Sequence, residues 1–317
     1  METTRLSEVW MRLEQIAREE GVTRLGASNL EDTHAALTRV WLDRGHHATM
    51  RYLEKSAAIR DDPAARYPWA KSVVVILVPY SPNRPDAPDG ALSHHLSRYA
   101  LGDDYHDVLE RILRKFEAAL DGIRTWRYVD TGPLSDRSLA AQAGLGWIGK
   151  NGMLIHEEDG SYFFIGTLLT SLENDIDATL VSDRCGTCTR CLDACPTDAI
   201  LPDRTIDSAL CISHATIEQR GPLDEAVAER LTGNAFGCDI CQEVCPWNRR
   251  PPETHPAFSP RDEYRATPLT DLLRFSQADF STLFRRSAVK RAKLAGMVRN
   301  AAAVIETSVD QKSGAGT

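Results

Sequence analysis

The eight cysteines of this 317-residue sequence all lie between residues 185 and 245, at spacings that suit iron–sulfur clusters. The first run, residues 185–196, has the C-x2-C-x2-C-x3-C-P pattern of bacterial ferredoxins. The second run, residues 238–246, has the pattern C-x2-C-x3-C-P, and Cys211 stands upstream in place of its first ligand. Together the two runs predict two [4Fe–4S] clusters and therefore electron transfer.

In two-cluster ferredoxins the last cysteine of each run ligates the other cluster. We therefore assign one cluster to Cys185, Cys188, Cys191 and Cys245, and the other to Cys195, Cys211, Cys238 and Cys241. Zinc and disulfides are the alternatives. A zinc site closes at four ligands and does not need two Cys-Pro ends. Disulfides need an oxidising compartment, and the sequence starts without an apolar signal segment.

The composition fits a cytoplasmic enzyme. A chain of this length can bury a sizeable core, and its longest apolar run, residues 73–78, has the length of a buried strand rather than of a membrane span. Lys and Arg number 37 against 45 Asp and Glu, for a net charge of −8. The overall field therefore does not attract nucleic acid, and any such contact needs a local basic patch. We expect a monomer without membrane contact.

The hydrophobic patterns predict an α+β fold in three parts. Residues 1–180 alternate helices and strands, as in an α/β domain large enough for a bulky cofactor. Its predicted elements are a helix with Ser7 as N-cap and Gly21 as stop, a fully buried strand at 72–80, a helix at 104–120 and a strand at 162–169. Residues 181–250 form a ferredoxin-like domain with a helical insert at 211–236, and residues 251–317 form a helical segment.

The helical segment carries a basic patch. Between residues 281 and 305 there is no acidic residue and there are six basic ones, namely Arg285, Arg286, Lys290, Arg291, Lys293 and Arg299. Such a cluster suits contacts with phosphate groups. A solvated helix face is the alternative interpretation, and the net charge of −8 makes that alternative serious.

Residues 128–151 hold further side chains suited to chemistry. Asp130 precedes Thr-Gly-Pro133, at a strand end where a helix begins. A general acid held near a ligand fits this place if burial raises the pKa of the carboxyl, and a cap of the next helix fits it equally. Residues 144–149 match G-x-G-x-x-G but follow a helical stretch instead of a strand. We therefore predict a tight turn there rather than a dinucleotide site.

Several motifs together resemble those of the epoxyqueuosine reductases. They are residues 129–133 and 144–151, Ser97-Arg98-Tyr99-Ala100 with Asp104-Tyr105-His106, residues 211–218 and the two cysteine runs. The resemblance extends from about residue 1 to residue 305, which makes it far more specific than the ferredoxin pattern alone. Members of that family reduce epoxyqueuosine to queuosine at the wobble position of tRNA anticodons, using cobalamin and two [4Fe–4S] clusters.

The resemblance implies roles for individual residues. It places the proton donor at Asp130, with Asp136 and Asp104 as fallback acids. It also implies that residues 1–180 bind the cobalamin and that an external donor supplies electrons through the clusters. The implied cobalamin contacts are Arg60, Arg98, Asp130, Ser213 and Asp239, and the implied tRNA contacts are Arg220 and, in the basic patch, Lys290 and Arg291.

Many members of that family continue into a C-terminal pair of helical repeats that helps to hold tRNA, whereas this sequence ends soon after Ile305. We expect this departure to affect tRNA affinity more than chemistry. Two other functions stay open, a corrinoid reductase or dehalogenase of a small molecule and a non-catalytic electron-transfer subunit. Respiratory dehalogenases usually carry an export signal, and an electron-transfer subunit leaves the first 180 residues without a purpose.

Overall fold

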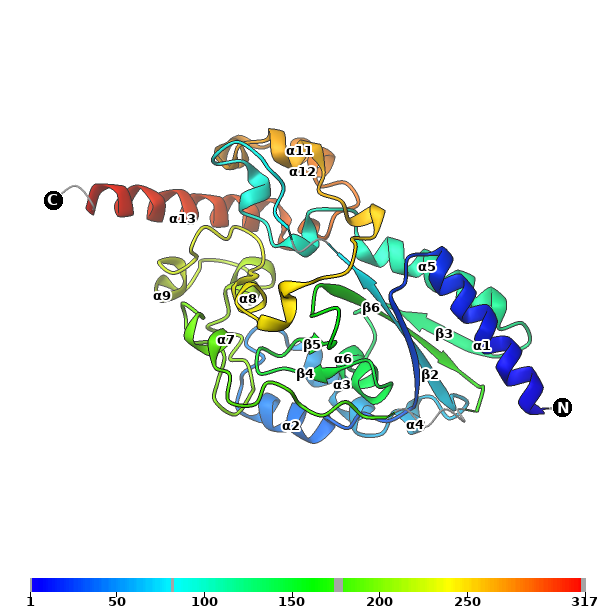
Figure 1. Ribbon diagram of the computed structural model, residues 1–317. Helices are drawn as coiled ribbons and strands as arrows, with labels where there is room; N and C mark the ends of the chain where they lie inside the picture. The colour runs from blue at the N-terminus through cyan, green and yellow to red at the C-terminus, as the bar shows by residue number, and fades with distance from the viewer. Residues whose placement is uncertain (1, 81–82, 174–178, 315–317) are drawn as a thin grey trace.

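The computed structural model describes residues 2–80, 83–173 and 179–314, and it confirms a fold of mixed helices and strands (Figure 1). The main sheet is antiparallel, with strand order β1-β2-β6-β3. Its strands are β1 (Arg24–Asn29), β2 (Ser72–Pro79), β3 (Thr125–Tyr128) and β6 (Phe163–Thr170), while β4 (Trp147–Ile148) pairs with β5 (Leu154–Ile155). No helix in the described ranges is long and apolar enough to cross a lipid bilayer.

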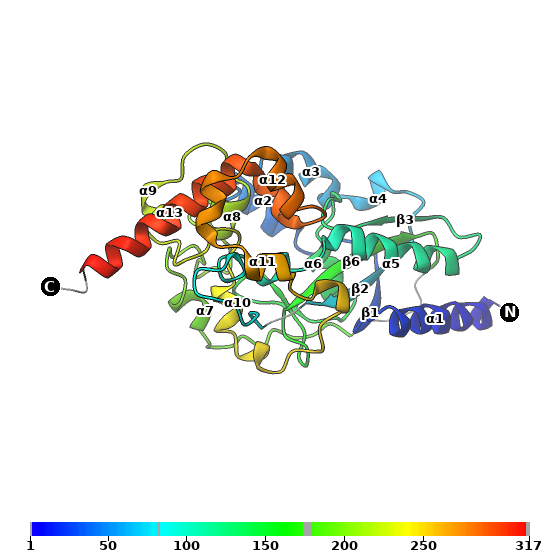
Figure 2. The same cartoon turned by 90° about the horizontal axis from the view of Figure 1, so that it is seen from above.

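Helices cover both faces of the sheet, as the two views show (Figures 1 and 2). Side chains of β2 alternate between the faces. Ile76 points into the core shared with α1 and α5, and Leu77 into the core shared with α6, so the strand predicted at 72–80 is confirmed as buried on both sides. The helices of this part are α1 (Glu2–Glu19), α2 (Ala35–Asp43), α3 (Tyr52–Asp61), α4 (Pro63–Arg66), α5 (Tyr105–Ala119) and α6 (Asp136–Gln142).

The first helix is longer than the sequence predicted. It begins at Glu2, so the prediction of Ser7 as its N-cap is wrong. Neither glycine nor proline interrupts residues 2–7, and the helix therefore continues through them. The stop at Gly21 is confirmed by its positive φ of 66°. The helix predicted at 104–120 is α5, and Asp104 caps it by accepting a hydrogen bond from the backbone N–H of His106.

Residues 181–250, called the cluster domain below, consist of loops and short helices (Figure 1). They lie at one end of the part that contains the main sheet, called the sheet domain below. Trp41 Nε1 donates to the carbonyl oxygen of Ile206 (2.7 Å), and Thr49 Oγ1 lies 2.8 Å from His214 Nε2. These bonds fix the domain to the segment that contains α2 and α3. Its helices are α7 (Arg190–Asp193), α8 (Ile212–Ile217), α9 (Glu225–Ala228) and α10 (Ile240–Glu243), of which α8 and α9 confirm the predicted helical insert.

The C-terminal helices hold the insert in place. One core contains side chains from residues 92–101, 212–236 and 264–304. Within it the buried Asn300 donates to the carbonyl oxygens of Thr216 and Ala235, both at 2.8 Å. The helices are α11 (Asp262–Ala266), α12 (Gln277–Leu283) and α13 (Lys293–Gly314), and α13 extends from the body on the side opposite the N-terminus (Figure 1).

Gly102 is expected to tolerate no side chain, because a Cβ there would lie 2.5 Å from the Cα atom of Phe258. Gly102→Ala should lower the free energy of unfolding by about 1–3 kcal/mol, the usual cost of overpacking. The matched control is Gly296→Ala in α13, where the new Cβ would lie 3.6 Å from the Cβ atom of Ala292. That change should raise the free energy of unfolding by roughly 0.5–1 kcal/mol. Chemical denaturation measures both, and equal stabilities would contradict the packing described.

Candidate active site and cluster sites

Four cysteines line one cavity of about 270 Å³. They are those predicted for the first cluster, Cys185, Cys188, Cys191 and Cys245. Cys191 lies in α7 and Cys245 follows α10, so the packing of these two helices brings the two cysteine runs together. Burial raises the pKa of the Cys191 thiol, and the nearby Cys185 and Cys245 add to the rise.

The remaining four cysteines, Cys195, Cys211, Cys238 and Cys241, form the second group. Burial is the main cause that raises the pKa of Cys238 to about 12, and the nearby thiols of Cys211 and Cys195 raise it further. The pKa of Cys241 is raised for the same reasons. Thiols of this kind are protonated at neutral pH unless a metal centre stabilises the thiolate.

The cysteine sulfurs are spread too widely for one metal ion. Sulfurs around a tetrahedral zinc lie roughly 3.8 Å apart, because Zn–S bonds are about 2.3 Å long. Across the described ranges, one group of three potential ligand atoms lies within 4.8 Å of one another, and it consists of His156, Glu158 and Asp159. Arg24 already pairs with both of those carboxylates. None of the eight cysteines, all of which lie in the described ranges, forms a disulfide in the structure.

The glycine-rich segment 144–151 contacts both cysteine runs and consists of two turns, at Gly144 and after Gly149, with the short strand β4 between them. Gly146 has a φ of 144°, and a Cβ there would overlap the carbonyl oxygen of Ile155. Lys150 Nζ donates to the carbonyl oxygens of Gly186 (2.8 Å) and Cys188 (2.9 Å). Asn151 Nδ2 donates to the carbonyl oxygen of Cys241 at 3.5 Å. The turn predicted in place of a dinucleotide site is therefore confirmed.

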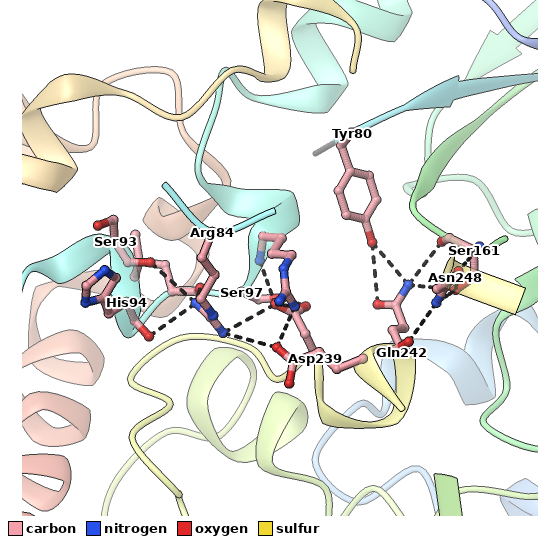
Figure 3. Close-up of polar contacts among 12 residues, drawn as sticks. Tyr80, Arg84, Ser93, His94, Ser97, Ser161, Asp239, Gln242 and Asn248 are labelled. Carbon is pink, nitrogen blue, oxygen red and sulfur yellow. Dashed lines mark hydrogen bonds and ion pairs between the residues drawn. The ribbon is translucent and has the colours of Figure 1, made fainter. Parts of the chain in front are cut away.

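A buried carboxylate joins the second cysteine run to the sheet domain (Figure 3). Asp239 is 1% exposed and accepts hydrogen bonds from Ser97 Oγ and from the backbone N–H of Arg98, the latter at 2.8 Å. Two guanidinium groups balance its charge, Arg98 Nη1 at 3.4 Å and Arg84 Nη2 at 3.7 Å. The carboxylate predicted to contact cobalamin is thus already fully engaged within the protein.

The other side of α10 is bound by a second polar group (Figure 3). Gln242 Nε2 donates to the carbonyl oxygen of Ser161 (3.0 Å) and lies 3.3 Å from the hydroxyl of Tyr80, at the end of β2. Asn248 Nδ2 donates to the carbonyl oxygen of Gln242 at 2.8 Å. Because α10 is fixed from both sides, the cysteines at its ends have a set position relative to the sheet.

Asp130 lies in an exposed loop between β3 and α6. Its φ is 59°, its side chain is 68% exposed, and its Oδ2 accepts a hydrogen bond from the hydroxyl of Tyr105 at 2.6 Å. Arg60 Nε donates to the carbonyl oxygen of Pro133 (3.0 Å) and so holds the same loop. The N-cap of α6 is Ser135, so the alternative that Asp130 caps this helix is wrong. Asp130 is thereby left available for chemistry.

Asp136, a fallback acid, occupies a different environment. Its carboxylate accepts a hydrogen bond from Thr167 Oγ1 of β6 at 2.8 Å. Burial, with the charge of Asp130 as a smaller cause, raises the pKa of Asp136 to about 7. Asp136 is therefore a half-buried carboxyl group bonded to β6, whereas the side chain of Asp130 is exposed.

Tyr99 lies between the second cysteine group and the loop that carries Asp130, which is called the acid loop below. Burial raises the pKa of its hydroxyl, and the nearby carboxylates of Asp130 and Asp239 add to the rise. Beside it, Arg98 Nε is buried without a hydrogen-bond partner in the described part of the chain. Such a donor suits the amide- and phosphate-bearing periphery of a corrinoid. Ser213 is the last of the residues predicted to contact cobalamin. It lies in the first turn of α8, two residues after Cys211.

Two cysteine groups fixed beside an acid loop define an iron–sulfur oxidoreductase of mixed α and β structure. Residues 184–248 match the family model of a 4Fe-4S double cluster binding domain, and residues 60–131 match that of Epoxyqueuosine reductase QueG, DUF1730. The epoxyqueuosine reductase of Leadbetterella byssophila is 40% identical over 286 residues, which cover 88% of this chain and 92% of that protein. This chain belongs to the epoxyqueuosine reductase family.

Solved structures agree with this assignment. An epoxyqueuosine reductase crystallised with an epoxyqueuosine-modified tRNA-Tyr stem loop matches at a TM-score of 0.87 and 31% identity, over 95% of this chain and 82% of that chain. The Bacillus subtilis epoxyqueuosine reductase matches at a TM-score of 0.84 and 30% identity, with the same coverage. In that structure a catalytic loop named for its aspartate is swung out of the active site.

Sequence reasoning assigned no role to three residues that the structure brings to these sites. Tyr105 and His106 begin α5, and both face Asp130. Lys150 supports the first cluster loop. The run Asp104-Tyr105-His106 was a usable signal, because a polar run at a helix start places its side chains beside neighbouring loops. The partners of Lys150 lie more than 30 residues away in the sequence, so no local sequence pattern could have predicted its contacts.

Lys150→Met is expected to loosen the loop of the first cluster and to remove a positive charge beside it. Reduced iron–sulfur clusters carry more negative charge, so the potential of that cluster should fall, by about 60 mV if the equilibrium changes tenfold. Redox titration followed by electron paramagnetic resonance measures the potential, and iron analysis measures occupancy. The control is Lys71→Met. Lys71 lies just before β2, and its ammonium group pairs with Glu173. An unchanged potential and iron content in the Lys150 variant would contradict this role.

Proposed function

We propose that this chain reduces the epoxide of epoxyqueuosine in tRNA to the alkene of queuosine, at the wobble position of the anticodon. The reaction consumes two electrons and two protons and releases water. The similar protein crystallised with an epoxyqueuosine-modified tRNA stem loop carries this proposal. The two cysteine groups support it, because they would hold the clusters that supply electrons, and so does Asp130, which would supply a proton.

The two cysteine groups are proposed to ligate the clusters in the interlocked manner described above. Electrons from an external donor would pass from the Cys185 group to the Cys211 group, which is next to Asp239 and Tyr99. Cobalamin, when bound, supplies a strongly reducing or nucleophilic cobalt. Arg60, Arg98, Asp130 and Ser213 would hold it, with Asp239 contributing through its backbone because its carboxylate is engaged.

The proposal divides the chain by task. Residues 1–180 form the cobalamin-binding catalytic domain, residues 181–250 the ferredoxin-like domain and residues 251–317 the helical segment with the basic patch. The Bacillus subtilis relative has a catalytic loop that is named for an aspartate and is swung out of the active site. This supports Asp130 as the proton donor, because Asp130 is an exposed aspartate in a loop after β3. We propose that the enzyme acts as a monomer in the cytoplasm, where its tRNA substrate is found.

Asp130→Asn is expected to keep both clusters and to lower turnover by about 10²–10⁴-fold, because the amide cannot donate a proton to the departing oxygen. Asp136→Asn is the matched comparison and should retain turnover, since that carboxyl faces β6. Anaerobically reconstituted protein is assayed on epoxyqueuosine-containing tRNA with and without cobalamin, and the mass of the released nucleoside is measured. A larger loss in Asp136→Asn would transfer the acid role to Asp136.

The same assay tests the other functions. No conversion by protein with both clusters present would favour a small-molecule corrinoid reductase. A protein that binds no cobalamin would instead act as an electron-transfer subunit. Loss of one oxygen that depends on cobalamin would exclude both.

The basic patch is the proposed tRNA surface, but half of it is engaged within the protein. Arg286 pairs with Asp107, Arg291 pairs with Glu218, and Arg299 donates to carbonyl oxygens of the insert. Arg220 donates to the carbonyl oxygen of Arg291 at 2.8 Å and so links the insert to the patch. In the described part of the patch, the side chains with neither an ion pair nor a hydrogen bond are those of Arg285, Lys290 and Lys293.

Lys290→Glu is expected to weaken tRNA binding and to lower the slope of log affinity against log salt by about 1, as the loss of one phosphate contact predicts. Arg291→Gln should have the smaller effect, because Glu218 already balances that charge. Gel shifts across salt concentrations measure both, with Lys71→Glu as the control outside the patch. Equal affinities of the wild type and Lys290→Glu would identify the patch as a solvated helix face.

A further inference from the structure

Asp130 alone does not complete the proton supply of the proposed reaction, on which this inference rests. Removal of the epoxide oxygen as water needs two protons, and one carboxyl group holds one. Asp130 must therefore regain a proton within each turnover. The structure around Asp130 contains one imidazole that can supply it.

His106 is held between two carboxylates. Its Nδ1 lies 2.8 Å from Asp104 Oδ1, and its Nε2 lies 3.8 Å from Asp130 Oδ2. Asp104 also accepts the backbone N–H of His106 at 3.1 Å, so the ring is fixed by two bonds to one carboxylate. The ring stacks on Tyr105 at 4.1 Å, and Tyr105 in turn donates to Asp130. The imidazole therefore directs its second nitrogen toward the proposed acid.

We propose that His106 is a proton relay that returns a proton to Asp130 during the reaction. The Nε2–H bond breaks and an O–H bond forms at Asp130 Oδ2. His106 then takes a proton from water, because its side chain is 38% exposed. A separation of 3.8 Å is longer than a hydrogen bond, so transfer requires a small movement of the loop or one bridging water. Two protons thus enter from solvent for each two electrons from the clusters.

The charges around His106 favour its protonated form. Burial lowers the pKa of the imidazole, but the hydrogen bond and charge of Asp104, with the charges of Asp130 and Asp107, outweigh burial and raise it above 6.5. The cations nearby are occupied elsewhere, Arg286 by Asp107 and Arg261 by Asp103. His106 therefore holds a proton more readily than a free imidazole does, and it can transfer that proton to a carboxylate that has just lost its own.

The test uses the reconstituted holoenzyme and measures kcat for epoxyqueuosine-containing tRNA as a function of pH. In the wild type, kcat should fall as pH rises through the raised pKa of His106. His106→Gln should lose that dependence and about 10²-fold in kcat, with the KM for tRNA and the iron content unchanged. Added imidazole should restore turnover to His106→Ala. Asp107→Asn is the control, because Asp107 lies outside the path to Asp130 and is the smallest of the named causes that raise the pKa of His106. It should keep the kcat of the wild type at low pH and move the fall in kcat less than Asp104→Asn does.

A second variant, Asp104→Asn, distinguishes loss of the relay from loss of structure. Asp104→Asn keeps a good N-cap for α5 but removes the charge that raises the pKa of His106, so the fall in kcat should move to lower pH. An unchanged pH profile in both His106→Gln and Asp104→Asn overturns the relay. So does a loss of kcat that imidazole does not restore. If the wild type with both clusters converts no substrate, the proposed function itself fails and the inference falls with it.

Discussion

The burial of the Asp239 carboxylate is the constraint on which the remainder of the site depends. An unpaired charge in the interior costs several kcal/mol, so the carboxylate is stable only while its partners stay in place. Those partners come from residues 84–98, a segment distant in sequence from the second cysteine run. The pairing therefore specifies how the cluster domain meets the sheet domain, and Gln242 fixes the other side of the same short helix.

The contact at Asp239 also brings the second cysteine group close to the Asp130 loop. Residues 97–99 run directly from the Asp239 partners to Tyr99, which is close to both the second cysteine group and Asp130. A few residues later Asp104 caps α5, and that cap orients Tyr105 and His106 toward the acid loop. The groups proposed to deliver electrons and protons are thus positioned by one continuous stretch of chain. A shift in the cluster domain would disturb both.

The six cations of the basic patch are not equivalent. Some are bonded within the protein, and the others have side chains that remain available for contact with a partner. Arg299 satisfies carbonyl oxygens at the end of the insert, and Arg291 is held by both oxygens of Glu218. Only a side chain whose charge is not balanced by a neighbour gains from a phosphate contact. Arg285, Lys290 and Lys293 meet that condition, whereas Arg286, Arg291 and Arg299 are engaged within the protein.

Features that depend on local spacing could be predicted from residue order. They include the cysteine runs, the buried strand at 72–80, the helix after Asp104 and the turns around the glycines of 144–149, because the geometry of each is set within a few residues. Residue order did not reveal which carboxyl group is exposed, which cations are paired or that His106 lies beside Asp130. Those outcomes depend on contacts between segments far apart in the chain, where burial and neighbouring charges, and not sequence spacing, set the properties of each side chain.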